Sequence, residues 1–561
     1  MASSPVRMTA PCSGSVTHRP SSVTTNATVL GICVLVIAVT SFEGVRVLLR
    51  KRRYTTGFVV CAPFLLLLTA AIVAEALSKK IYTSGEVVAY AGFFGFLLLL
   101  ILRNAFSPVA KAAAGDQVLR GSTLVSADTM MTSIYGKKGA KQVSAIQKVI
   151  RIGEVVIPAP AESQHLLFSG TTGSGKTQGI NRVLQVVRAR GKRALVADAS
   201  GGFVARFYQV GDLLFNPFDQ RSVDWSPFAE VRAEYDCARI AKAAIPDGHG
   251  DGQEWHHYAQ TLLGETMLAL LKRDRRSIKQ LLHYLTSADN KELGELLTGT
   301  PAAILCAKGN DKMLANTRGI ISTYLVAWRY LADEGQFSVR SWIQDEAQVN
   351  WLFVTYRDDQ LGMLRMLVAT ILELATIEGL SLSENPDRDL WFVMDEVDSL
   401  GKVSSLRSGL TKLRKYGCKV VLGLQTISQL RATYGHDEAQ TLLANISTKA
   451  VLRAGDGETA EYFSKEFGDQ EITRMQWSQT DGASQNSGIM AAGSASQSTS
   501  TTQIREHKRT ILASEIVGLP DLCGFLKTPG APIGYIELPY QHLPEVTPSY
   551  VESGIALLKS G

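Results

Sequence analysis

The segment HLLFSGTTGSGKTQGINRVLQVVRARG (165–191) decides the fold. An apolar run precedes eight residues, GTTGSGKT (170–177), that match the pattern G-x-x-x-x-G-K-[ST]. Apolar residues then follow at positions 180, 183, 184 and 187, the spacing of an amphipathic helix. A strand, a glycine-rich loop and a helix in this order predict a P-loop that binds polyphosphate.

The loop residues have separate roles in this prediction. Glycines let the backbone curl so that successive N–H groups point at phosphate oxygens, and the following helix adds the positive end of its dipole. We expect Lys176 to reach the β- and γ-phosphates and the Thr177 hydroxyl to bind Mg²⁺. The predicted cofactors are ATP and Mg²⁺. The predicted nucleotide-binding residues are Gly170, Thr171, Thr172, Gly173, Ser174, Gly175, Lys176 and Thr177.

A nucleotide site of this kind needs a second carboxylate for the metal and a group that activates water. The segment LWFVMDEVDSLG (390–401) supplies both, because its apolar residues predict a buried parallel strand that ends in two acids. Asp395 falls at the carboxyl end of that strand, where ligands bind in open α/β sheets. We assign Asp395 to Mg²⁺ through water and Glu396 to the catalytic base; caps on the next helix are the structural alternative.

Two further residues have both a catalytic and a structural interpretation. The run CKVVLGLQT (418–426) predicts another buried strand, and Gln425 at its end either senses the γ-phosphate or satisfies a loop backbone. Upstream, TKLRKYG (411–417) contains Arg414. In ring ATPases an arginine reaches the nucleotide of the neighbouring subunit, whereas the structural alternative for Arg414 is a solvated basic helix end.

The spacing of the strands predicts an α/β domain that carries an insertion. Strand-like runs lie at 193–198, 212–217 and 351–356, whereas residues 229–340 show almost only helical patterning. We therefore expect a nucleotide-binding domain in two parts with an all-α domain between them. Residues 478–503 are rich in Ser, Gly, Gln and Ala, which predicts a mobile loop. The expected domains are 104–228 (linker and first part), 229–340 (all-α) and 341–545 (second part), followed by a tail at 546–561.

The composition of the chain limits the number of domains, the partners and the cellular compartment that we expect. The chain has 561 residues, which is enough for two or three domains. Its formal net charge of +6 permits contact with nucleic acid or anionic lipid without requiring either. The seven cysteines are scattered and form no CxxC pair, which argues against a disulfide framework or structural zinc and favours a reducing compartment.

The N-terminal region is predicted to be a membrane anchor. After a tail at 1–25, three apolar stretches within 26–103 (28–42, 55–77 and 84–102) approach the roughly 20 residues that cross a bilayer. Basic residues flank them at 46–53 and from Arg103 onward, and such residues stay on the cytoplasmic side. Two spans and three spans both satisfy this rule, and both leave the remaining chain in the cytoplasm. A buried hairpin of a soluble domain is the alternative.

Over nearly its whole length the sequence resembles the conjugative type IV coupling proteins. The resemblance rests on the P-loop, on FNPFDQRSVDWSPF (215–228), on LWFVMDEVDSLG, on KLRKYGCKVVLGLQTISQL (412–430) and on ILASEIVGLPDLCGFLKTPG (511–530). It implies a RecA-like motor at the bacterial inner membrane. It also implies a homo-hexamer around a central channel and partners that include single-stranded DNA, a relaxase, secretion-channel components and membrane lipids.

Some residues carry an expectation through this resemblance. Gly170, Gly175, Lys176, Thr177, Asp395, Glu396, Gln425 and Arg414 match the family's functional positions. Asn216, Asp219, Arg221 and Trp225 also match, and we expect a structural role: Arg221 pairs with an acid and Trp225 packs at the domain junction. Asp198 ends the second strand, where related motors place an acid.

A basic run, LLKRDRRSIK (270–279), lies in the expected all-α domain. It either binds DNA phosphates or is an ordinary solvated face. The candidate DNA-binding residues are Lys272, Arg273, Arg275, Arg276 and Lys279.

The resemblance therefore implies a DNA-dependent ATPase that recruits relaxase-bound single-stranded DNA and delivers it to a secretion channel. Two alternatives are an FtsK-type pump for double-stranded DNA and a membrane docking platform gated by nucleotide. The pair Asp395 and Glu396 argues against a docking platform, because a protein that only binds nucleotide needs no carboxylate to activate water.

Overall fold

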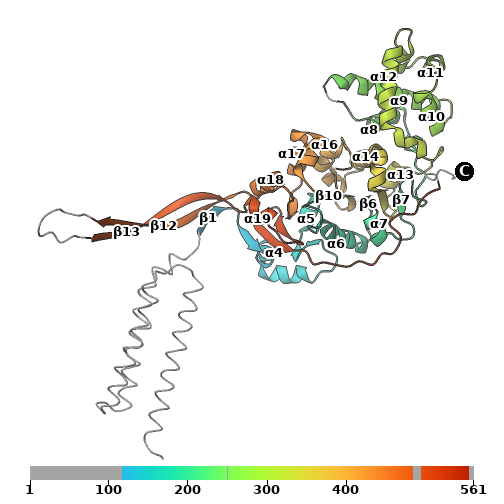
Figure 1. Cartoon of the computed structure of the whole chain (residues 1–561). Coiled ribbons are helices and arrows are strands. Elements are labelled where there is room, and N and C mark those ends of the chain that lie inside the picture. Colours follow the sequence, from blue (N-terminus) through green and yellow to red (C-terminus); the bar gives the residue numbers. More distant parts are fainter. Residues whose placement is uncertain (1–116, 249, 398, 484–494, 555–561) are drawn as a thin grey trace, which may run out of the picture. The chain divides into compact units, whose positions relative to one another are not determined.

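The computed structural model describes residues 117–248, 250–397, 399–483 and 495–554 (Figure 1). The predicted tail at 1–25 and the predicted spans within 26–103 lie outside the described residues. Among the described residues, one helix, α14 (Asp358–Leu380), is long and apolar enough to cross a membrane. More than half of its apolar stretch is buried inside the protein, with Leu367 and Ile371 fully inaccessible, so we interpret α14 as a core helix.

A ten-stranded sheet organises the described chain, in the order β2-β15-β14-β11-β5-β10-β9-β6-β8-β7. From β11 to β7 each strand runs parallel to the next, whereas β14 pairs antiparallel with both β11 and β15. The edge strand β2 pairs in parallel with β15. The strands are β2 (Leu124–Ser126), β5 (Leu166–Ser169), β6 (Ala194–Ala199), β7 (Leu213–Phe215), β8 (Leu352–Tyr356), β9 (Leu390–Met394), β10 (Cys418–Leu424), β11 (Thr448–Leu452), β14 (Cys523–Lys527) and β15 (Ile533–Glu537).

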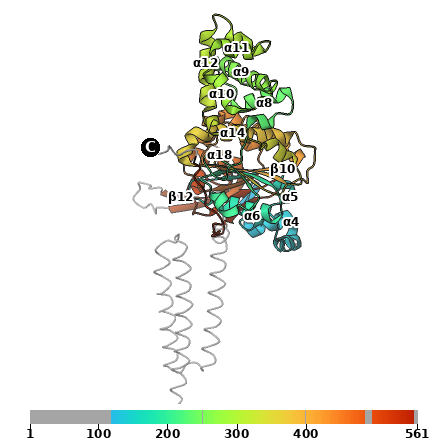
Figure 2. The same ribbon diagram turned by 90° about the vertical axis from the view of Figure 1, so that its right-hand side faces the viewer.

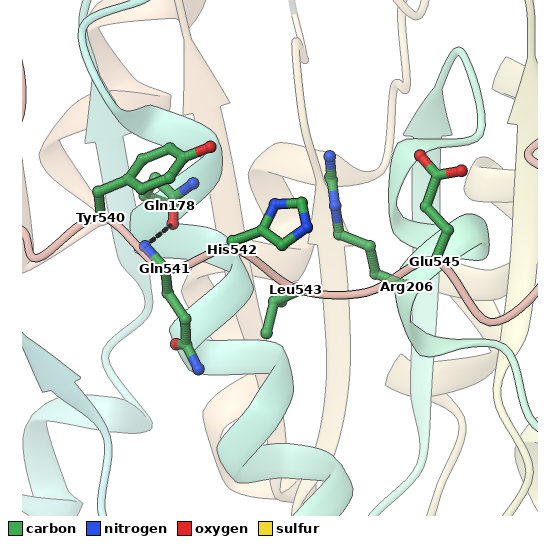
Figure 3. A pocket seen from close by; sticks show the side chains of 7 residues that line it. All are labelled: Gln178, Arg206, Tyr540, Gln541, His542, Leu543 and Glu545. Carbon is green, nitrogen blue, oxygen red and sulfur yellow. Dashed lines mark hydrogen bonds between the residues drawn. The ribbon is translucent and has the colours of Figure 1, made fainter.

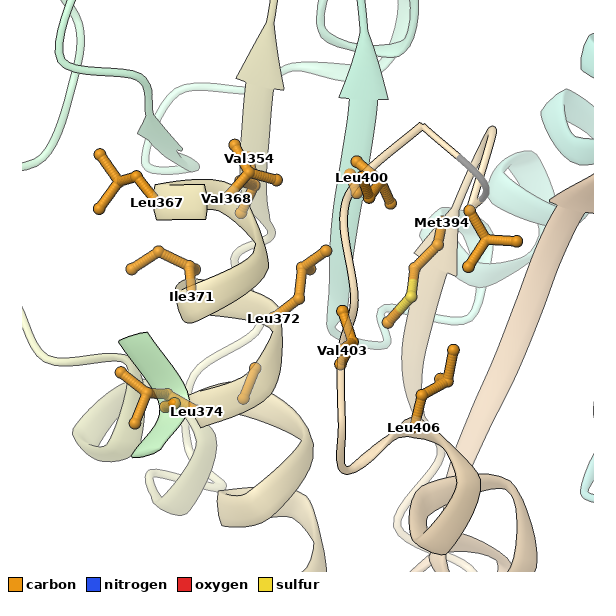
Figure 4. Close-up of a cluster of buried hydrophobic side chains, with 14 of the residues drawn as sticks. Val354, Leu367, Val368, Ile371, Leu372, Leu374, Met394, Leu400, Val403 and Leu406 are labelled. Carbon is orange, nitrogen blue, oxygen red and sulfur yellow. The ribbon is translucent and has the colours of Figure 1, made fainter. Parts of the chain in front are cut away.

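Helices bury both faces of the sheet, which explains why its strands read as unbroken apolar runs. Successive side chains of a strand point to opposite faces. Trp391 and Val393 of β9 join an apolar cluster with α6 and α7, whereas Phe392 and Met394 join the cluster that contains α14. Figure 4 shows the second cluster. The covering helices are α6 (Lys176–Ala189), α7 (Gly202–Phe207), α15 (Leu406–Lys412), α16 (Ile427–Tyr434), α17 (His436–Ala444) and α18 (Gly457–Phe467).

Every described element between β7 and β8 is helical, and the helices α8 to α12 gather at one side of the sheet (Figures 1 and 2). Trp225 joins the two parts: its ring contacts Phe215 of β7 and Trp328, edge to face. Trp225 therefore packs at the domain junction, as expected. The helices are α8 (Glu234–Ala244), α9 (Gln253–Leu271), α10 (Ile278–Thr286), α11 (Asn290–Leu296), α12 (Asp311–Tyr324) and α13 (Val339–Gln344), with short 3-10 turns η1 (Pro227–Glu230), η2 (Gly250–Gly252), η3 (Pro301–Cys306) and η4 (Val326–Tyr330).

The prediction of a loop over 478–503 is wrong for the described part of that segment. Strands β12 (Asp469–Ala483) and β13 (Ala495–Arg509) pair antiparallel along their whole length, and β1 (Gln117–Gly121) pairs with the start of β12. The composition argued that the segment cannot build a core of its own. A two-stranded ribbon needs no core to satisfy its backbone, because each strand bonds the other.

The predicted tail at 546–561 is docked on the nucleotide-binding domain over 546–553. Val546 N–H donates to the Ala205 carbonyl at 2.7 Å, and Gln220 N–H donates to the Val551 carbonyl at 2.8 Å. Arg221 pairs with Asp219 at 2.7 Å and donates to the Pro548 carbonyl at 2.8 Å. The predicted acid partner of Arg221 is therefore present, and the pair also holds the C-terminal segment. We call residues 538–553 the C-terminal strap.

Six further short or peripheral elements complete the described fold. They are α4 (Ala127–Ser144), β3 (Arg151–Ile152), β4 (Val155–Val156), α5 (Ala159–Glu162), η5 (Leu413–Tyr416) and α19 (Ala513–Val517).

Candidate nucleotide-binding site

The glycine-rich loop 170–175 leaves the carboxyl end of β5 and enters α6, as the sequence predicted. Neighbouring segments fix its shape. Gly170 N–H donates to the Leu424 carbonyl at 3.1 Å, and Thr171 N–H donates to the Arg453 carbonyl at 2.8 Å. Gly175 has φ of +111°, and a Cβ there would lie 2.8 Å from the Leu522 side chain. The loop is thus held in a conformation that a side chain at 175 would disturb.

Lys176 begins α6 and turns its side chain back across the loop. Its Nζ donates to the Gly170 carbonyl at 2.6 Å, and the residue is only 7% exposed. Thr177 follows in the first turn of α6, where its side chain is exposed. The ammonium and the helix N-terminus both face the mouth of the loop, where they favour an anion.

Three strand ends meet beside the loop, because β10 pairs in parallel with both β5 and β9. Asp395 directly follows β9 and Gln425 directly follows β10, so both lie at the same edge of the sheet as the loop. Gln425 Nε2 hydrogen-bonds Glu396 Oε1. The structure therefore brings Glu396 and Gln425 together at the strand ends that carry the loop, and it gives Gln425 a partner, Glu396, that the sequence did not identify.

Glu396 has φ of +60°, a left-handed conformation that residues other than glycine adopt rarely. Such strain persists only where surrounding structure enforces it, and it concentrates at functional sites. Here the bond from Gln425 and the Val397 N–H bond to the Gly423 carbonyl at 3.1 Å hold the segment. The carboxylate is thereby fixed beside the loop.

The donor set suits Mg²⁺ that arrives with a nucleotide. Among the described residues, no group of three or more His, Cys, Asp or Glu side chains could hold a metal ion. Mg²⁺ prefers oxygen ligands and commonly binds through one or two protein groups plus substrate phosphates and water. Thr177 and Asp395 offer one hydroxyl and one carboxylate of this kind, so the residues present fit the ion.

Gly423 of β10 makes room for Asp395, and this predicts a sensitive position. A Cβ at Gly423 would lie 2.5 Å from Asp395 Oδ1. Gly423→Ala should displace that carboxylate and lower kcat for ATP by about 10-fold or more, since misplacing a catalytic group by about 1 Å can cost 10²-fold. Gly362→Ala, where a Cβ meets nothing within 4 Å, is the matched control in a steady-state ATPase assay. Equal rates for the two variants would contradict the assignment of Asp395.

Asp198 of β6 lies in the interior near this edge. Its Oδ2 accepts the N–H groups of Phe203 and Val204 at 2.8 and 2.7 Å, which holds the start of α7. Burial, with a smaller contribution from the charge of Asp395, raises the pKa of Asp198 to about 7, although these two bonds oppose the shift. Asp198 thus has a structural role and is also electrostatically linked to the site.

Arg414 lies at the amino-terminal ends of the parallel strands, whereas the loop of its own chain lies at their carboxyl-terminal ends. It precedes β10 in η5 and is exposed, whereas the loop follows the parallel strand β5. The seven residues of β10 separate these two ends of the strands by about 23 Å. Arg414 therefore cannot reach the phosphates bound to its own chain.

Sequence reasoning missed His165, which joins β5 to the segment that carries Arg414. Its Nε2 hydrogen-bonds the Leu410 carbonyl at 3.0 Å, and its Nδ1 accepts the Val420 N–H at 3.1 Å. Burial lowers the pKa of His165 to about 4, so the ring is neutral at pH 7. A single histidine before an apolar run carries no signal that would have identified this role.

The basic run forms the exposed turn between α9 and α10, far along the chain from the loop. Lys272, Arg273, Arg275, Arg276 and Lys279 are all exposed. Lys272 Nζ lies 3.2 Å from Glu234 Oε1, also exposed, so this pair leaves most of the positive charge in solvent. Exposure fits both interpretations of the run.

The fold and the site together define the class: a mixed α/β protein with a P-loop nucleotide site and a helical insertion. Residues 149–539 match the family model described as the type IV secretion-system coupling protein DNA-binding domain. The match covers more than half of the chain. The chain belongs to this family of type IV coupling proteins.

Similar proteins agree with that membership. The chain is 29% identical over 415 residues to the coupling protein TraD of Escherichia coli K12, which covers 72% of this chain and 57% of TraD. It is 26% identical over 361 residues to the conjugal transfer protein TraG of Escherichia coli, which covers 56% of each. The chain thus spans a little over half the length of these relatives.

Solved structures of a bacterial conjugative coupling protein, TrwB, share the fold. The unbound TrwBdeltaN70 structure is 33% identical with a TM-score of 0.69, which covers 78% of this chain and 98% of that one. TrwB in complex with ADP and Mg²⁺ is 32% identical with a TM-score of 0.68, which covers 79% and 99%. TrwB has also been solved with the ATP analogue ADPNP and the GTP analogue GDPNP.

Proposed function

We propose that this chain is a coupling ATPase of the bacterial inner membrane that moves relaxase-bound single-stranded DNA to a type IV secretion channel during conjugation. Family membership and the nucleotide complexes of TrwB support the proposal. In this account the protein is a multi-pass membrane protein, its ATPase domain is cytoplasmic, and it works as a homo-hexamer. Its partners are the relaxase-bound DNA, the secretion channel and membrane lipids.

The chain binds ATP with Mg²⁺ in this account. The N–H groups of the loop 170–177 and the Lys176 ammonium hold the phosphates, and Thr177 and Asp395 hold the ion. When bound, Mg²⁺ neutralises charge between the β- and γ-phosphates. Glu396, oriented by the bond from Gln425, accepts a proton from the attacking water. Gln425 thereby links the strand next to the P-loop to the catalytic base.

The observation that carries the motor proposal is the placement of Arg414. The P-loop lies at the carboxyl-terminal ends of the parallel strands and Arg414 lies at their amino-terminal ends, so one chain cannot complete its own site. A head-to-tail contact between copies brings the Arg414 of one subunit to the phosphates of the next. Repeated around an axis, such heterologous contacts close into a ring.

This arrangement predicts complementation between two inactive variants. Arg414→Ala should lower the rate by about 10³-fold or more, because an arginine finger contributes about 10³–10⁵. A subunit with Lys176→Ala has no working loop but keeps Arg414. Mixing the two variants should restore part of the activity, because the intact arginine of one faces the intact loop of the other.

The double variant Lys176→Ala/Arg414→Ala is the control, and it should rescue neither single variant. Lys415→Ala, at the exposed neighbouring cation, should leave the rate close to wild type. ATP turnover is measured in mixtures whose co-assembly is shown by co-purification of differently tagged subunits. Co-assembled mixtures without activity would contradict an active site shared between subunits.

DNA binding by the basic turn is a separate prediction. Charge reversal at Arg273 and Arg276 should weaken the affinity for single-stranded DNA. It should also reduce the slope of the logarithm of the binding constant against the logarithm of the salt concentration by about 0.7 per lost phosphate contact. Charge reversal at Lys308 and Lys312, also exposed in the helical insertion, is the matched control. Affinities are measured by fluorescence anisotropy at roughly 50 to 200 mM salt, a range over which binding to phosphates changes strongly. An unchanged slope in the Arg273/Arg276 variant would leave this turn an ordinary surface.

A further inference from the structure

A cavity of about 270 Å³ lies beside the first turn of α6, outside the residues assigned to the phosphates (Figure 3). It is formed by α6, the end of α7 and the C-terminal strap. Gln178, which lines it, directly follows the predicted Mg²⁺ ligand Thr177. The lining residues are Gln178, Arg206, Tyr540, Gln541, His542, Leu543 and Glu545.

The strap is anchored on both sides of this cavity. Before it, Leu538 N–H donates to the Leu522 carbonyl at 2.7 Å, in the segment that also meets Gly175. Within it, Gln541 N–H donates to Gln178 Oε1 at 3.2 Å. After it, the bond from Val546 to Ala205 and the pairing with residues 218–221 fix the chain. The cavity wall is therefore a built part of the fold.

The close fit of the strap at Gly201 supports the same conclusion. Gly201 has φ of +72°, and a Cβ there would lie 2.3 Å from the Ser549 carbonyl oxygen. Only glycine adopts this conformation without strain and admits the strap backbone at this distance. The strap residues that line the cavity follow position 539, where the family-model match ends.

The position of the cavity fits the nucleoside end of a bound nucleotide. In the proposed function the γ-phosphate lies toward the strand ends where Asp395, Glu396 and Gln425 meet. The α-phosphate and the nucleoside attached to it must then leave the loop past the first turn of α6, where Gln178 lines the cavity. The volume is close to the lower end of the roughly 300–1,000 Å³ range of small-molecule pockets.

The side chains at the cavity have the chemistry that a base and a sugar require. Tyr540 is 69% exposed, so its ring is accessible to a base that stacks on it. In Figure 3, Tyr540 and His542 project to the same side of the strap as Arg206 and Glu545. A guanidinium also stacks on bases, and a carboxylate accepts hydrogen bonds from sugar hydroxyls.

We propose that the strap cavity binds the base and the ribose of the nucleotide, with Tyr540 as the stacking residue and Glu545 on the ribose hydroxyls. This inference rests on the proposed nucleotide function and adds its nucleoside subsite. Stacking recognises the face of a base, so it does not distinguish adenine from guanine. The strap then contributes affinity for nucleosides rather than for phosphate.

The test compares ATP with inorganic tripolyphosphate, which has the phosphates but no nucleoside. Binding of each with Mg²⁺ is measured by calorimetry on the full-length protein in detergent, with Glu396→Gln present throughout to stop turnover. Tyr540→Ala should weaken ATP and GTP binding by about 5- to 150-fold and leave tripolyphosphate binding unchanged. Tyr540→Phe, which keeps the ring, should bind ATP nearly as the parent does.

Tyr235→Ala is the matched control, because Tyr235 is 71% exposed but lies on α8 in the helical insertion. An unchanged ratio of ATP to tripolyphosphate affinity in Tyr540→Ala would overturn the subsite, whether both affinities stay the same or fall together. A Lys176→Ala variant should lose both ligands. If the parent protein binds neither ligand, the proposed function fails, and that result is distinct from failure of the subsite.

Discussion

Lys176→Ala is expected to lower ATP turnover by at least about 10²–10³-fold, the loss typical when one preorganised charge-stabilising donor is removed. Lys176 Nζ lies at the mouth of the loop, 2.6 Å from the Gly170 carbonyl oxygen. When nucleotide enters, this buried ammonium exchanges that carbonyl for phosphate oxygens. An alanine at position 176 cannot pair with the negative charge that develops on the γ-phosphate. Both the affinity for ATP and the rate of turnover therefore fall.

Lys192→Ala is the matched control for this variant. Lys192 lies in the loop that follows α6 at its other end, so its removal changes the charge of the domain equally without touching the site. Steady-state phosphate release and nucleotide affinity are measured for both variants. Near wild-type turnover by Lys176→Ala would show that this loop is not where ATP is hydrolysed.

Glu396→Gln is expected to lower turnover by about 10²–10⁴-fold, the usual contribution of a positioned general base. Unlike the lysine variant, it should bind ATP with almost unchanged affinity, because Glu396 acts on the attacking water and not on the phosphates. The shape of the side chain is kept, and its Oε1 still accepts a bond from Gln425. The loss therefore isolates proton transfer.

The two measurements for Glu396→Gln are single-turnover hydrolysis and equilibrium binding of ATP. Glu384→Gln removes an exposed carboxylate from the loop after α14 and serves as control. Loss of binding in parallel with turnover would mean that Glu396 supports the phosphate site. Unchanged turnover would require another residue as base.

Much of the fold was predictable because its strands carry a strong local signal. Strands buried on both faces read as apolar runs, and β9 and β10 fall within one residue of the predicted runs. The P-loop was predictable for a similar reason, since glycine spacing, the lysine and the helix period all lie within 20 or so consecutive residues. Asp395 followed from the rule that ligands gather at the carboxyl ends of strands.

The features that the sequence did not reveal depend on contacts between distant segments. Gly423 is required by the Asp395 carboxylate on the neighbouring strand, and nothing around position 423 indicates that carboxylate. The β12–β13 ribbon pairs polar strands whose composition resembles that of a loop. The docking of the strap on Asp219 and Arg221 joins positions about 330 residues apart, so it gives no local pattern.

ATP turnover by the full-length protein in detergent, measured with and without single-stranded DNA, distinguishes a DNA-moving ATPase from a protein that only binds nucleotide. We expect turnover that rises when DNA is added and that both Lys176→Ala and Glu396→Gln abolish. A protein that binds ATP and DNA, assembles, and still shows no turnover under either condition would contradict the motor and leave a nucleotide-gated docking platform.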